Sequence, residues 1–125
     1  MIPVPIPACT GMQAGTRIVV ATRPVDFRRG MDGLATLVQQ QLQADPFVGD
    51  LFVFRSKRAD RIKILVWDGT GLCLFAKRLD RGRFTWPPIR DGVMTLSATR
   101  LGLLLEGLDW SRVHARPTRR PAVAG

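Results

Sequence analysis

The spacing of apolar residues changes along the chain, and each change predicts a different element. A β-branched run over residues 17–22 is closed by an Arg-Pro pair and predicts a first strand. Apolar residues then recur at helical spacing with glutamines between them, which predicts an amphipathic helix to about Gln43. Asp26 can cap this helix, but two following glycines make a start near Met31 or Asp32 equally compatible with the pattern.

From residue 51 the period becomes two, which is typical of an antiparallel meander. The predicted strands are residues 51–55, 61–67, 72–79 and 83–86. Gly69-Thr70 suits a two-residue type II′ hairpin. Beyond two prolines, residues 93–96 predict a last short strand, Ser97 can cap a second amphipathic helix, and Gly107 suits its left-handed end. The expected fold class is therefore α+β, with an antiparallel meander of four to six strands packed against two amphipathic helices.

Strand register follows if the apolar positions must share one face of the sheet. Pairing Arg55 with Arg61 accomplishes this for the first hairpin, since it sets Phe54 opposite Ile62 and Phe52 opposite Ile64. The Gly69-Thr70 turn continues the same face by setting Ile64 opposite Phe75 and Val66 opposite Cys73. The other face then holds a row of three arginines, Arg55, Arg61 and Arg78, with Lys63, Leu65 and Trp67 beyond it. Because like charges opposite one another destabilise a sheet by up to about 1 kcal/mol, the row favours an anionic ligand. The alternative for each side chain is solvation or pairing with Asp60 and Asp80.

The composition is typical of a folded basic domain and limits the classes of partner that the chain is expected to bind. The 125 residues include 19 Lys and Arg against 10 Asp and Glu, a net charge of +9. Such a surplus favours nucleic acid, an anionic membrane surface or an acidic protein. Apolar runs fall far short of the roughly 20 residues that span a bilayer, and two cysteines without a close pair indicate a reducing, cytoplasmic setting with no membrane partner. We expect one domain over residues 17–110, an extended proline-rich lead-in over 1–16 and a disordered basic tail over 111–125.

Candidate catalytic groups are sparse. His114 is the only histidine and lies in the predicted tail. The carboxylates mostly neighbour Gly or Pro, as turn and cap residues do. Asp68 is the best acid for metal-dependent chemistry, yet the glycine after it explains it as a turn residue. We therefore expect no enzyme, no metal and no cofactor.

Four ordered motifs carry a resemblance that covers residues 18–110. They are TRPVDFRRGMDGL at 22–34, DPF at 45–47 leading to LFVF at 51–54, KILVWDGTGLCLFAKRL at 63–79, and RFTWP at 83–87. With them the chain resembles the second-frame accessory protein, TnpB type, of the insertion-sequence-sixty-six family of bacterial transposable elements. The resemblance implies a role in DNA transposition beside a separate, larger transposase that carries the catalytic acids. It implies no activity of its own and no catalytic residues.

Two functions of different classes remain open from the sequence. In the first, basic residues of the sheet and its hairpin contact phosphates of element-end DNA. The candidate contacts are Arg28, Arg29, Arg55, Lys57, Arg58, Arg61, Lys63 and Arg78. In the second, the protein docks on the transposase through exposed aromatics, with Trp67 as the candidate contact. The oligomeric state is not determined by the sequence.

Overall fold

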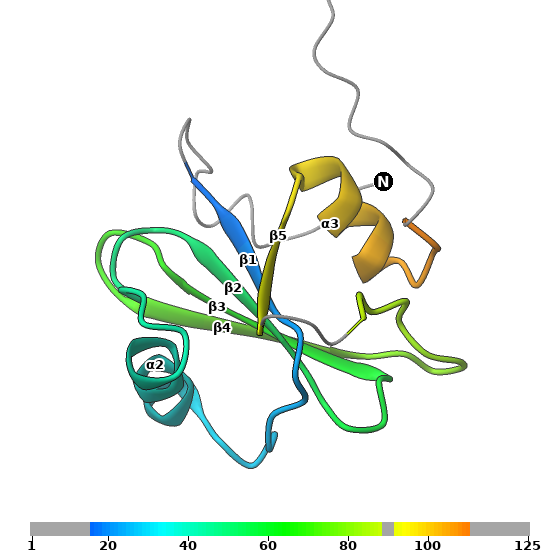
Figure 1. Ribbon diagram of the computed structural model, residues 1–125, viewed down its shortest axis with the longest axis horizontal. Helices are drawn as coiled ribbons and strands as arrows, with labels where there is room; N and C mark the ends of the chain where they lie inside the picture. The colour runs from blue at the N-terminus through cyan, green and yellow to red at the C-terminus, as the bar shows by residue number, and fades with distance from the viewer. Residues whose placement is uncertain (1–15, 89–91, 111–125) are drawn as a thin grey trace, which may run out of the picture.

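Five strands form one mixed sheet with a helix on each face (Figure 1). The computed structural model describes residues 16–88 and 92–110. In chain order the elements are β1 (Ile18–Ala21), α2 (Met31–Gln40), β2 (Leu51–Arg55), β3 (Arg61–Trp67), β4 (Leu72–Arg78), β5 (Val93–Leu96) and α3 (Ala98–Leu105). The strand order is β4-β3-β2-β1-β5, with β1 parallel to β2 and every other pair antiparallel. The predicted α+β class is confirmed. The sheet is mixed because the connection from β1 to β2 crosses over through α2.

Both faces of the sheet are buried, each under one helix. On one face, Leu101, Leu104 and Leu105 of α3 pack on alternate residues of the central strands. On the other, α2 packs through its buried residues on the intervening positions. The first set of strand residues includes Val53, Ile62, Ile64 and Val66; the second includes Val19, Phe52, Phe54 and Leu65. Because consecutive strand residues are apolar, the sequence offers no clean alternation from which to choose a face.

The predicted register of the first hairpin is wrong by one residue. Arg55 lies opposite Ile62, not Arg61, and Phe54 lies opposite Lys63. A loop of four residues, 57–60, sets this pairing, with Ala59 in the left-handed region at φ 66°. Since a shift of one residue moves side chains to the other face, Arg55 lies on the α3 face while Arg61 lies on the α2 face. The row of three arginines is therefore absent.

The second hairpin follows the prediction. Ile64 lies opposite Phe75 and Val66 opposite Cys73. Gly69 has φ 106°, as the first central residue of a type II′ turn requires. This register also sets Arg61 directly opposite Arg78 at the far end of the two strands.

The structure shows which of the two expected starts of the first helix is correct. Helix α2 begins at Met31 with Gly30 as its N-cap, so Asp26 is not its cap. It ends at Gln40 because Gln43, with φ 50°, has a left-handed backbone that cannot continue a helix. Ser97 caps α3 by accepting from the Arg100 amide at 3.1 Å, and Gly107 at φ 77° follows its end, both as predicted.

The predicted strand at residues 83–86 is wrong. The Phe84 amide and the Trp86 Nε1 both donate to the Ala59 carbonyl oxygen, at 2.9 and 3.1 Å, so this segment crosses the first hairpin instead of extending the sheet. Phe84 is 3% exposed in the α3-side core, and its burial explains the path. None of the described helices is long and apolar enough to span a bilayer. Residues 1–15 of the expected lead-in, and the whole expected tail, lie outside the described residues.

Candidate nucleic-acid interface

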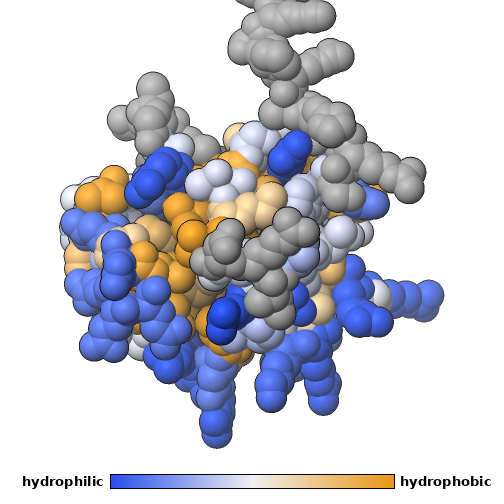
Figure 2. All heavy atoms as spheres, in the orientation of Figure 1, coloured by the Kyte–Doolittle hydropathy of each residue, from blue (hydrophilic) through white to orange (hydrophobic). Residues whose placement is uncertain are grey.

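Two adjoining hollows bring most of the predicted basic residues together. The first, of about 600 Å³, lies between residues 24–28 and the 56–58 part of the β2–β3 loop. The second, of about 430 Å³, lies over the paired ends of β3 and β4. Phe27 and Arg61 line both. We call their combined surface the basic groove. Figure 2 shows hydrophilic side chains projecting along the lower side of the molecule, where Figure 1 places these loops.

The segment 22–30 forms one wall of the groove because β1 and β2 are parallel. It leaves β1 at the same end of the sheet as the hairpin leaves β2. The Val25 amide donates to the Arg55 carbonyl at 2.9 Å, which ties the segment to the end of β2. Lys63 holds it from below, since its Nζ donates to the carbonyl oxygens of Phe27 at 2.8 Å and Arg29 at 3.0 Å. The same Nζ lies 5.0 Å from the centre of the Phe27 ring.

Four cations of the groove are uncompensated. They are Lys57, Arg58, Arg61 and Arg78, all exposed. Within residues 16–88 and 92–110 their side chains make no ion pair or hydrogen bond. Arg61 and Arg78 also face one another across the β3–β4 ladder, where like charges are mutually repulsive. An anion placed between them would relieve that repulsion.

Asp26 is the one carboxylate among the residues that line the groove, and Arg28 already engages it. Arg28 Nη2 lies 2.7 Å from Asp26 Oδ2, its Nε contacts both carboxylate oxygens, and its amide donates to Oδ1 at 2.9 Å. These hydrogen bonds lower the pKa of Asp26 to about 2. The pair is locally neutral, so Asp26 does not offset the four free cations.

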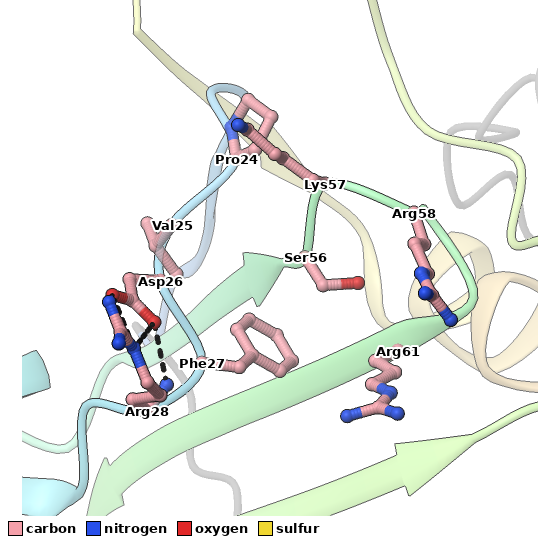
Figure 3. A pocket seen from close by; sticks show the side chains of 9 residues that line it. All are labelled: Pro24, Val25, Asp26, Phe27, Arg28, Ser56, Lys57, Arg58 and Arg61. Atoms are coloured by element: carbon pink, nitrogen blue, oxygen red, sulfur yellow. Dashed lines mark hydrogen bonds and ion pairs between the residues drawn. The ribbon is translucent and has the colours of Figure 1, made fainter.

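The inner part of the first hollow holds Phe27 and Ser56. Figure 3 shows the Phe27 ring and the Ser56 hydroxyl between the Asp26–Arg28 pair on one side and Arg58 and Arg61 on the other. Ser56 is only 9% exposed, and its Oγ has no hydrogen-bond partner. A buried hydroxyl without a partner is uncommon because it loses water without compensation. Sequence reasoning missed both residues, although Phe27 lies inside the first of the family motifs, between Asp26 and Arg28.

Three of the predicted contacts are placed differently. Arg55 lies on the α3 face, with its guanidinium 5.5 Å from the Trp86 ring centre, and burial lowers its pKa. Arg29 is exposed but does not line the groove. Lys63 lines the second hollow, yet two of its three donors serve main-chain carbonyls. The eight predicted residues thus divide into four free groove cations, one arginine paired with Asp26, two arginines whose side chains do not line the groove, and a lysine that positions the wall.

Trp67 lies at the other end of β3 from Arg61. It is partly buried and packs edge to face against Phe47, with ring centres 5.7 Å apart and planes at 86°. Phe47 and Val48 are 46% and 59% exposed. These three residues form what we call the aromatic end of the sheet, and it is separate from the groove.

Asp68 is a turn residue, as predicted. Its Oδ1 accepts from the amides of Thr70 and Gly71, both at 2.9 Å, and these bonds lower its pKa to about 2. In residues 16–88 and 92–110, no three His, Cys, Asp or Glu side chains lie close enough together to hold a metal ion.

Comparison with known proteins identifies the family. A family model described as IS66 Orf2 like protein matches residues 16–115. Two proteins of Sinorhizobium fredii, both described as uncharacterized, are similar over most of their length. One, y4jC, is 52% identical over 89% of this chain and 95% of its own length; the other, y4hO, is 44% identical over 87% and 93%. No solved structure is significantly similar to this chain. The ordered motifs, and a family match that spans every described element, show that the chain belongs to the IS66 Orf2 family, the TnpB-like accessory proteins of IS66 insertion sequences.

Proposed function

We propose that this protein is a non-catalytic accessory factor of IS66 transposition that binds DNA phosphates through the basic groove. The observation that carries the proposal is the set of four exposed cations without carboxylate partners, next to an aspartate whose charge Arg28 already offsets. Phosphate contacts of this kind provide affinity and position without sequence specificity. Selection of the element ends then comes from the transposase or from DNA shape.

The salt dependence of DNA binding tests the proposal. The logarithm of the association constant is expected to fall linearly with the logarithm of salt concentration, by about 0.9 for each phosphate neutralised on duplex DNA. Arg78→Gln removes one groove cation and is expected to lower that slope by about one. Arg83→Gln is the matched control, because Arg83 is exposed and lies outside both hollows. Absence of DNA binding at low salt, or an equal loss from Arg83→Gln, contradicts the proposal.

A second candidate function is docking on the transposase through the aromatic end. Its support is the partly exposed Trp67–Phe47 pair beside exposed Val48, since exposed aromatic clusters are typical of protein interfaces. Co-purification of the two proteins from nuclease-treated lysate tests it. The complex is expected to survive Arg78→Gln and to be lost with Trp67→Ala. The opposite pattern would assign transposase contact to the groove.

A further inference from the structure

The basic groove combines features that a flat phosphate-binding surface does not need. One is an aromatic ring inside a hollow, and the other is a buried hydroxyl without a partner beside two arginines (Figure 3). Backbone contacts to duplex DNA require neither, because exposed cations suffice for them. A nucleotide whose base is unpaired has a use for both, because its base can stack and its phosphate can accept a hydrogen bond.

We propose that the basic groove binds an unpaired nucleotide, with its base stacked on Phe27 and its phosphate held by Arg58, Arg61 and the Ser56 hydroxyl. This inference rests on the proposed function and specifies its substrate as single-stranded DNA. In a duplex each base face is covered by its neighbours, so a ring recessed in a hollow is reached only by a base that has left the stack. The volume of the first hollow, about 600 Å³, is within the range of small-molecule sites, which accommodate a ligand the size of a nucleotide.

The second observation is the state of Ser56. Its Oγ is buried and unpartnered, and Figure 3 shows it in the interval between Phe27 and Arg58. A phosphate oxygen would accept from this hydroxyl, which removes the cost of leaving it unpaired. Arg58 and Arg61 supply the charge that a phosphodiester needs, and Asp26, the one carboxylate that lines the groove, is already paired with Arg28.

The Phe27 ring is also held ready for stacking. Lys63 fixes the main chain at Phe27 and two residues beyond it, through the carbonyls of Phe27 and Arg29, and its ammonium lies 5.0 Å from the ring centre. A ring that is already positioned loses less conformational entropy when a base stacks on it. The segment that carries Phe27 and the strand β3 beneath it therefore form a surface for base stacking next to a phosphate-binding site.

The test compares three fluorescent oligonucleotides of equal length: a single strand, the same sequence as a duplex, and a fully abasic strand. Wild-type protein is expected to bind the single strand about tenfold more tightly than the abasic strand, the effect of one stacked base. Phe27→Leu is expected to remove that difference. Phe47→Leu is the matched control, because it shortens an exposed aromatic at the other end of the sheet. Ser56→Ala is expected to weaken binding of both single strands equally.

The outcomes separate this inference from the proposed function. Salt-dependent binding that is equal for the normal and abasic strands overturns the unpaired-nucleotide site while leaving phosphate binding intact. No binding of any oligonucleotide overturns both. The wild-type comparison of the two strands decides the matter even if Phe27→Leu fails to fold, and Phe27→Trp, which keeps a stacking surface, is expected to retain the preference.

Discussion

Lys63 and Arg61 lie two residues apart on the same face of β3, yet the structure gives them different tasks. Lys63 donates to two carbonyls of the segment that forms the groove wall, whereas Arg61 is exposed and makes no contact of this kind. Replacing each with a neutral side chain, as in Lys63→Met and Arg61→Gln, therefore separates a positioning lysine from a phosphate contact. The same charge is removed in both variants.

The expected magnitudes follow from these contacts. Hydrogen bonds from a charged donor contribute about 1.5–3 kcal/mol, and Lys63 is only partly buried, so we expect Lys63→Met to lower the free energy of unfolding by about 1–2 kcal/mol. For a domain of this size that is a fall in Tm of roughly 5–10 °C. Arg61→Gln is expected to change stability by less than about 0.5 kcal/mol, or to raise it slightly by relieving repulsion from Arg78.

For the salt dependence of DNA binding, we expect the larger effect from Arg61→Gln and the smaller one from Lys63→Met. Arg61→Gln lowers the slope of log affinity against log salt by about one, while Lys63→Met weakens binding without changing that slope. Urea unfolding and a salt titration on the same two samples measure both quantities. An unchanged Tm together with a reduced slope for Lys63→Met would refute the reasoning, because the ammonium would then be contacting phosphate instead of the wall.

Three further predictions concern single groups. Ser56→Ala removes an unpartnered buried hydroxyl, so it is expected to raise the free energy of unfolding by about 1 kcal/mol while weakening DNA binding. Urea unfolding measures the first effect and a DNA titration the second. A destabilised variant would mean that the hydroxyl has a hydrogen-bond partner in solution. Gly69 has φ 106°, so Gly69→Ala is expected to lower the free energy of unfolding by about 1–2 kcal/mol. Gly102 lies inside α3 with open space around it, so Gly102→Ala is expected to raise the free energy of unfolding by about 0.5–1 kcal/mol. Equal effects of the two variants in thermal unfolding would contradict the turn assignment. The pKa of Asp26 is lowered from 3.8 to about 2, so its pairing with Arg28 is fully present above about pH 4 and is lost as the pH falls through 2; a carboxyl NMR titration with its midpoint near 4 would disprove the pairing.

Most of the fold could be predicted from the sequence because strand limits and turns leave local signals. The strands at 51–55 and 61–67, the Gly69-Thr70 turn and the Ser97 cap are all confirmed. The first hairpin could not be predicted in register, since every residue from Leu51 to Phe54 is buried and either register places apolar residues on both faces. Its loop geometry depends on Ala59 in a left-handed conformation that alanine seldom adopts.

From the sequence, the candidate site could be predicted only as a cluster of basic residues. The clustering of basic residues near the hairpin located Lys57, Arg58, Arg61 and Arg78, and the structure brings these four to one groove. The registers assumed for the sheet placed Arg55 among them, and one residue of slip moves it to the other face. Nothing local in the sequence marks Ser56 as unpartnered, because that property arises from tertiary packing around it.

The position of β1 in the sheet has a consequence for the order of folding. This strand comes first among the described elements, yet it lies between β2 and β5, and the Thr22 amide that begins the groove wall donates to Gly92 just before β5. Contacts between such distant parts of a chain form late, after the local hairpins. During synthesis the β2–β3–β4 hairpins can assemble while β1 still lacks one neighbour. A nascent chain ending before β5 would therefore lack the Gly92 contact at the start of the groove wall, while Arg55 and Lys63 of the hairpin already tie residues 25–29 to the sheet.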